Sequence, residues 1–221
     1  MKATLLVLGL WCICLTSLSA DEAAISSSGK RVLLNDNGTW SIVKETNFGT
    51  KDFRNCKWGM TKNDVLKAEK LKASDLSYNE AQGMGSASSI ASLSCQVLYI
   101  FAHDKLVRSK YYITESHSNN NLFVEQDYPK LKELLIKKYG PPVKEDTLWS
   151  NDLYKDSPQE WGMALVVGHL SFYCSWETEK TAIVLYLSGD NFKVNFGIEY
   201  SSKEWGGLEQ QQTEDEITGK L

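Results

Sequence analysis

One stretch of the chain, from Phe53 to Glu69, constrains the possible fold more than any other. Thr61 is placed to cap a helix that starts at the next residue, and Asp64 stands three residues later, as in a capping box. Gly59 lets the backbone turn sharply just before this cap. The stretch therefore predicts a short strand, a tight corner and a helix over residues 62–70.

The N-terminus has the composition of a secretory signal. Lys2 precedes an apolar run over residues 4–15, and small residues follow up to Ala20. The run is shorter than the ~20 residues that a membrane helix needs, and no later stretch is apolar over such a length. We expect a mature chain that begins at Ala20 or Asp21 and is periplasmic or secreted.

The charge balance argues against binding to nucleic acid. The chain has 24 Lys and Arg against 28 Asp and Glu, a net charge of −4. A protein that grips phosphate backbones usually carries a basic face. The densest basic patch, over residues 130–138, alternates with apolar positions and reads as the solvated side of a helix.

Three cysteines follow the predicted signal: Cys56, Cys95 and Cys174. In an oxidising compartment they allow one disulfide or none. If one forms, Cys95 with Cys174 is the preferred pair, because both lie in long apolar strands. Their spacing fits no zinc or haem motif.

A hairpin is predicted directly after the leader. Residues 31–34 and 39–43 have strand composition, and an Asn-Gly turn at residues 35–38 joins them. The segment from Arg31 to Trp40 resembles the hairpins, with a D-x-G-T-W pattern, that follow the signal peptide in many bacterial envelope proteins. That resemblance implies a location in the envelope.

A second resemblance concerns the Trp58-Gly59-Met60-Thr61 corner, with Val65 four residues further on. It is similar to the first helix of small bacterial envelope modules of the BamE/SmpA and β-lactamase-inhibitor-like group. Their fold, a helical pair on an antiparallel sheet, is what this resemblance implies. No partner-contacting residue of that group matches a position in this chain.

The remaining pattern predicts one more helix and a series of strands. Apolar residues at helical spacing end at Gly140, which is placed to terminate the helix in the left-handed conformation. The helical positions are Tyr128, Leu131, Leu134, Leu135 and Tyr139. Strands are expected at residues 76–81, 90–102, 106–114, 147–154, 161–176, 181–187 and 194–200, with a glycine-rich turn at 82–89.

These elements predict an α+β fold. It is an antiparallel sheet of meander strands with two helices packed on one face, preceded by a small β-hairpin. The expected domains are a signal peptide (1–20), a leader and hairpin (21–50, with 21–29 flexible), an α+β domain of two helix-plus-strands units (51–201) and a polar tail (202–221) that is disordered or weakly helical.

The sequence favours a protein without a catalytic set. The histidines His103, His117 and His169 are too far apart for a helical metal site, and no G-x-S-x-G or C-x-x-C motif occurs. We therefore expect no metal and no cofactor. A site assembled from distant residues stays an alternative.

Three tyrosines are the candidate binding residues. Tyr112, Tyr173 and Tyr186 alternate with the main apolar positions of their strands, which predicts a second, aromatic face of the sheet. The alternative is that loops or the hairpin cover this face.

The function that fits best is a non-catalytic binding module of the bacterial envelope, with an envelope protein or a cell-wall component as its partner. A secreted hydrolase or metal-dependent enzyme is the first alternative, which a histidine and carboxylate cluster in one cleft would favour. A carrier of a small apolar ligand is the second, which a sizeable buried cavity would favour.

Overall fold

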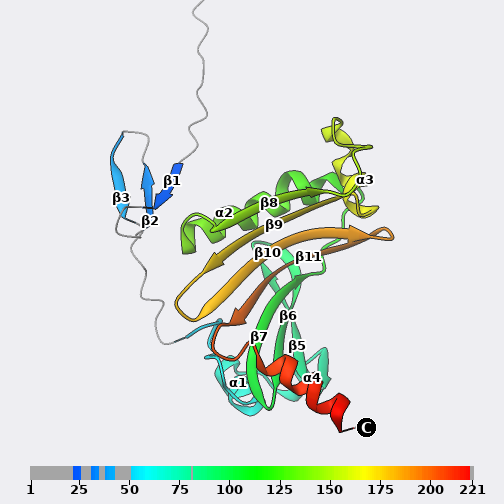
Figure 1. Cartoon of the computed structure of the whole chain (residues 1–221). Helices are drawn as coiled ribbons and strands as arrows, with labels where there is room; N and C mark the ends of the chain where they lie inside the picture. Colours follow the sequence, from blue (N-terminus) through cyan, green and yellow to red (C-terminus); the bar gives the residue numbers. More distant parts are fainter. Residues whose placement is uncertain (1–21, 26–30, 35–37, 43–50, 81, 220–221) are drawn as a thin grey trace, which may run out of the picture. The chain divides into compact units, whose positions relative to one another are not determined.

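The computed structural model describes residues 22–25, 31–34, 38–42, 51–80 and 82–219. The chain divides into two compact units, residues 1–44 and 45–221 (Figure 1). The predicted signal peptide lies outside the described residues.

The N-terminal unit is a three-stranded antiparallel sheet of β1 (Glu22–Ile25), β2 (Arg31–Leu34) and β3 (Trp40–Ile42). The predicted hairpin is confirmed, with Leu34 opposite Trp40. The prediction of a flexible leader is wrong for β1, which pairs with β2 from Glu22 to Ile25. A short apolar segment next to an open strand edge gains backbone hydrogen bonds by pairing with it.

The larger unit is built on one eight-stranded antiparallel sheet, so the predicted α+β class is confirmed (Figure 1). The strand order is β4-β5-β6-β7-β11-β10-β9-β8. Two four-strand meanders therefore meet where β7 pairs with β11, and each meander follows a helix in the chain. The elements are α1 (Lys62–Glu69), β4 (Tyr78–Glu80), β5 (Gly83–Ile90), β6 (Leu93–Ala102), β7 (Lys105–Ile113), α2 (Tyr128–Tyr139), β8 (Lys144–Trp149), α3 (Trp161–Val166), β9 (Leu170–Glu177), β10 (Thr181–Asp190), β11 (Lys193–Ser202) and α4 (Leu208–Thr218). Short 3-10 turns lie at Ala73–Asp75 and Pro158–Glu160, and a π-helical turn at Phe123–Asp127 leads into α2.

The predicted corner and capped helix are both present. Thr61 and Asp64 form the capping box of α1, and Gly59 has a φ of +81°. The backbone NH of Gly59 donates to the Leu106 carbonyl, and the Trp58 indole donates to Thr181 Oγ1 at 2.9 Å. The corner thereby joins the start of β7 to the start of β10.

Helix α2 buries Tyr128, Leu131 and Leu135. The Tyr128 hydroxyl donates to Cys174 Sγ on β9 at 3.3 Å, and its ring lies 5.3 Å from that of Phe172. Leu134, which the spacing placed on the same apolar side, is exposed instead. Gly140 ends the helix with the expected positive φ of 79°, but its ψ of −169° is extended rather than left-handed.

Two predicted segments are wrong. The expected turn at residues 82–89 is strand β5, whose glycines allow neighbouring side chains to pack closely. A Cβ on Gly83 would lie 2.8 Å from the Tyr78 ring, and a Cβ on Gly85 would lie 2.5 Å from Leu98 Cδ2. The expected strand from Trp161 begins instead as helix α3, because the Asn121 side chain accepts a hydrogen bond from the Gly162 backbone NH.

Strand ends differ by a few residues elsewhere. Strand β8 covers Lys144–Trp149 rather than 147–154, and β4 covers only Tyr78–Glu80. The polar tail contains α4, so the helical alternative is the one observed.

The three cysteines among the described residues are free and buried, so the preferred Cys95–Cys174 pair is wrong. Cys95 lies on β6 and Cys174 on β9, with β7, β11 and β10 between them. At ~4.8 Å per strand, the two Cα atoms lie far beyond the ~7 Å that a disulfide spans.

Replacement of Leu135 by Ala tests the packing of α2. Leu135 is 4% exposed, so its truncation should lower the free energy of unfolding by about 2–5 kcal/mol in urea. Lys137, two residues further on, is exposed, and Lys137→Ala should change stability by less than about 0.5 kcal/mol. Equal losses in the two variants would contradict this packing.

The thiols give a second prediction. Burial, followed by the charge and hydrogen bond of Glu69, raises the pKa of Cys56 to about 12, and burial also raises the pKa values of Cys95 and Cys174. Because only the thiolate is nucleophilic, all three should resist alkylation in the folded chain of residues 21–221 at about pH 8. After unfolding without reductant, mass spectrometry should count three alkylated thiols; fewer would indicate a disulfide.

Candidate functional site

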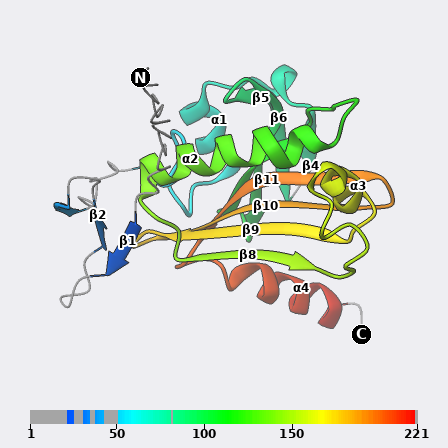
Figure 2. The ribbon, with the colours of Figure 1, turned by 90° about the horizontal axis from the view of Figure 1, so that it is seen from above.

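The eight-stranded sheet has two chemically different faces. We call the face that carries Ile183, Leu185 and Leu187 the inner face, and these three side chains are fully buried. Helix α2 lies against it through the contacts of Tyr128 with Cys174 and Phe172. The opposite side is the outer face, and α4 lies on that side of the sheet (Figure 2).

The three predicted tyrosines fall on one row of the outer face. Tyr112 on β7 is opposite Gly197 on β11, Gly197 is opposite Tyr186 on β10, and Tyr186 is opposite Tyr173 on β9. All three rings are half-buried. The pairing of the strands thus brings together side chains that are 61 and 13 residues apart in the chain.

Gly197 makes room in this row for the ring of Tyr186. A Cβ at Gly197 would lie 2.7 Å from Tyr186 Oη and 3.0 Å from its Cζ, so the ring lies across the backbone of β11. Burial, followed by the nearby Glu199 and Tyr112, raises the pKa of Tyr186 to about 12. The phenol therefore stays protonated and uncharged throughout the neutral range.

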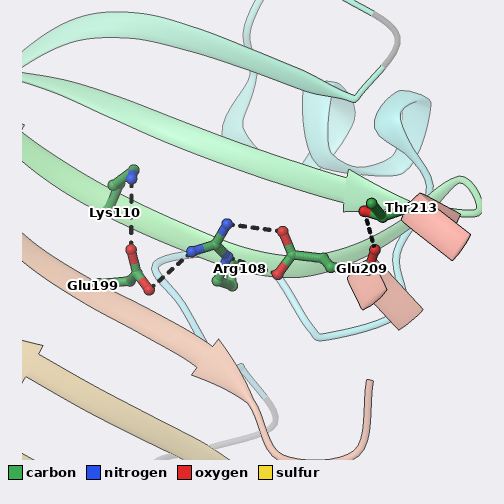
Figure 3. A network of polar contacts seen from close by, with 5 residues as sticks. All are labelled: Arg108, Lys110, Glu199, Glu209 and Thr213. Carbon is green, nitrogen blue, oxygen red and sulfur yellow. Dashed lines mark hydrogen bonds and ion pairs between the residues drawn. The ribbon is translucent and has the colours of Figure 1, made fainter. Parts of the chain in front are cut away.

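A charged network lies next to the tyrosine row on the same face (Figure 3). Arg108 Nη1 donates to Glu199 Oε1 at 3.1 Å, and Lys110 Nζ lies 3.5 Å from Glu199 Oε2. Arg108 Nη2 also donates to Glu209 Oε1 on α4, at 2.8 Å. Along β7, Arg108, Lys110 and Tyr112 follow one another at alternate positions, so the network and the row form one continuous surface.

Arg108, on β7, is linked to β11 through Glu199 and to α4 through Glu209. Its side chain and those of both glutamates are a quarter to a third exposed. Burial alone would lower the Arg108 pKa, but the hydrogen bonds and charges of Glu209 and Glu199 outweigh burial and raise it. Arg108 is therefore a permanent cation with a carboxylate on two sides.

A groove of about 480 Å³ opens beside this network. Leu98 and Ile100 of β6 lie on the outer face, next to Tyr78 of β4 and Gly83 of β5. Arg108 and Glu209 line it on the side of α4. Its lining residues are Tyr78, Gln82, Gly83, Leu98, Tyr99, Ile100, Arg108 and Glu209.

Arg108, Lys110, Glu199 and Glu209 were not predicted as site residues from the sequence. The alternation that selected Tyr112 also places Arg108 and Lys110 on its face, and Glu199 falls at a polar position of its strand. That signal was present in the sequence. The contribution of Glu209 had no such signal, because it depends on where α4 lies.

The structure does not gather the histidines into one cleft. His117 Nε2 lies 2.6 Å from Asp127 Oδ2, with its ring 4.6 Å from that of Phe123. His103, in the turn between β6 and β7, lies 3.7 Å from the exposed Asp215, and His169 lies against Tyr154. Within the described part of the chain, no three His, Cys, Asp or Glu side chains form a group that could hold a metal ion.

None of the helices among the described residues is both long and apolar enough to cross a membrane.

Gly197 can be tested directly. Gly197→Ala should lower the free energy of unfolding by about 1–3 kcal/mol, because the new methyl group would lie 2.4 Å from the Tyr111 carbonyl as well as against Tyr186. The matched control is Gly207→Ala, where nothing lies within 4 Å, and it should change stability by less than about 0.5 kcal/mol. Chemical denaturation measures both. Equal stability of the two variants would show that β11 has room for a side chain.

Comparisons of the chain with protein-family models, with curated proteins and with solved structures gave no match. The resemblances to envelope hairpin proteins and to the BamE/SmpA and β-lactamase-inhibitor-like group therefore stay predictions.

Proposed function

We propose that this protein is a non-catalytic binding module of the bacterial envelope that engages a protein partner through the outer face of its sheet. The observation that carries the proposal is the row of Tyr112, Tyr186 and Tyr173, which continues directly into the charges of Arg108 and Lys110. The secretory composition of residues 1–20 supports a periplasmic or secreted location.

The chemistry of the row supports binding. Tyrosine combines a large apolar ring with a hydroxyl, and tyrosine and arginine are enriched where protein interfaces derive most of their energy. Each ring here has only two side-chain torsions to order, and the strands already hold the three in line. A pre-ordered surface loses less conformational entropy on binding than a flexible one.

The architecture fits the same function. We propose that α1 and α2 together form the layer over the inner face, as in the envelope modules that the Trp58 corner resembles. The inner face then supplies the stability of the fold, and the outer face is left for recognition. Truncation of a tyrosine of the row would accordingly alter binding more than it alters folding.

The test is differential capture by the mature chain, residues 21–221, from an extract of the cell envelope. Tyr112→Ala and Tyr173→Ala should each weaken binding of the captured partner by about 1–2 kcal/mol, or roughly 5- to 30-fold, measured by titration with the isolated partner. Their melting temperatures should change little, because neither ring belongs to the fully buried set of the inner face.

The matched control is Phe192→Ala. Phe192 is an equally large ring that is 73% exposed, in the turn between β10 and β11 and away from the row. It should leave the affinity unchanged. A partner that binds all three variants equally well would contradict the proposed surface, and unfolding of both tyrosine variants would show that these rings belong to the core.

A further inference from the structure

Helix α4 is attached to the outer face mainly by polar contacts. Glu209 pairs with Arg108 (Figure 3). Gln212 Oε1 accepts a hydrogen bond from the backbone NH of His103 at 2.9 Å. Among its described side chains only Leu208, Glu209 and Gln212 are partly buried, and Ile217 is 57% exposed. A helix of this length that buries so little apolar surface depends on its contacts for stability.

The residues just before α4 are an anchored tryptophan and two glycines. The Trp205 indole lies against Gly59, at 3.2 Å from the position of a Cβ there, and Lys105 Nζ lies 3.9 Å from the centre of its ring. Gly206 and Gly207 then separate this anchor from the helix, and nothing lies within 4 Å of a Cβ at Gly207. Two adjacent glycines give the backbone wide conformational freedom at this point.

Glu209 is the part of α4 that lines the groove. We propose that α4 is a hinged, intramolecular stand-in for an acidic peptide segment of the partner: the partner's carboxylate replaces Glu209 on Arg108, and an apolar neighbour of that carboxylate lies on Leu98 and Ile100. The inference rests on the proposed binding function and names the chemistry of the segment that the groove accepts.

The charges of the network favour this exchange. When α4 is in place, the cations Arg108 and Lys110 are matched by the carboxylates of Glu199 and Glu209. When α4 swings away, Arg108 and Lys110 share Glu199 alone. One positive charge beside an apolar groove then attracts a carboxylate, and guanidinium binds carboxylate with two parallel hydrogen bonds.

The tether through Gly206 and Gly207 sets the concentration at which a free peptide segment can displace α4. A tethered helix acts at an effective concentration near ~1 mM, so a free segment of equal intrinsic affinity replaces it only above that concentration. A segment that binds more tightly replaces it at a proportionally lower concentration. Because Trp205 stays bound to the Trp58 corner, release of α4 leaves the sheet and its core unchanged. The exchange therefore costs the contacts of one helix and not the stability of the fold.

Hydrogen exchange tests the attachment of α4 in the chain of residues 21–221. Glu209→Gln should speed amide exchange over residues 208–218 by about tenfold, the effect of weakening one charged hydrogen-bonded pair. The matched control is Glu214→Gln, which removes the same charge from the same helix at an exposed residue whose carboxylate accepts a hydrogen bond from Gln210 on the same helix. It should leave exchange nearly unchanged. Equal exchange in the two variants would overturn the role of Glu209.

A peptide supplied in trans tests the groove. The probe is a fluorescent synthetic peptide of residues 206–219, titrated with the chain and followed by anisotropy. The Glu209→Gln chain should bind it about tenfold more tightly than the unaltered chain, because its own helix competes less well. The same peptide with Gln in place of Glu209 should not bind the Glu209→Gln chain. This comparison changes only the peptide and leaves the protein the same.

The outcomes separate this inference from the proposed function. Equal binding of the two peptides would overturn the Arg108 groove even if the tyrosine variants still lose the captured partner. Loss of the tyrosine-row effect with peptide binding intact would overturn the proposed surface instead. Arg108→Gln should abolish peptide binding, with exchange of the β6 and β10 amides as the check that the sheet is intact.

Discussion

Burial of the inner face of the eight-stranded sheet is the interaction on which the rest of the structure depends. Ile183, Leu185 and Leu187 are fully buried, as are Leu131 of α2 and Val65 of α1. Each such side chain contributes about 1.5–3 kcal/mol through the apolar area that it removes from water. A slip of one residue in any strand pairing would turn these side chains to the outer face, so their burial sets the register of every strand.

The outer face inherits its geometry from that register. Tyr112, Tyr186 and Tyr173 lie in one row because Gly197 is opposite both Tyr112 and Tyr186. A Cβ at Gly197 would meet both the Tyr111 carbonyl and the hydroxyl end of the Tyr186 ring, so the row depends on a glycine at this position. The polar contacts of Arg108 add helix α4 to this face, and the helix buries little apolar area there.

The sequence correctly predicts those parts of the fold that depend only on residues close together in the chain. The capping box of Thr61 and Asp64 and the helical spacing of α2 need only neighbouring residues, and both helices are where the sequence placed them. Strand β5 and helix α3 were predicted wrongly. The glycines of β5 make room for the Tyr78 ring and the Leu98 side chain, and Asn121 Oδ1 accepts a hydrogen bond from the Gly162 backbone NH at the start of α3. Both contacts depend on strand pairing and tertiary packing, which no local pattern predicts.

The candidate site likewise combines features that depend on local sequence with features that depend on tertiary packing. The sequence by itself determined the two faces of each strand, because side chains alternate in a strand, and so it identified Tyr112, Tyr173 and Tyr186 as distinct from the core. Only the tertiary structure decided that the three form one row, since strand order and register depend on burial summed over the whole sheet. The pairing of Glu209 with Arg108 was likewise decided there, because it joins residues 101 positions apart that no local pattern relates.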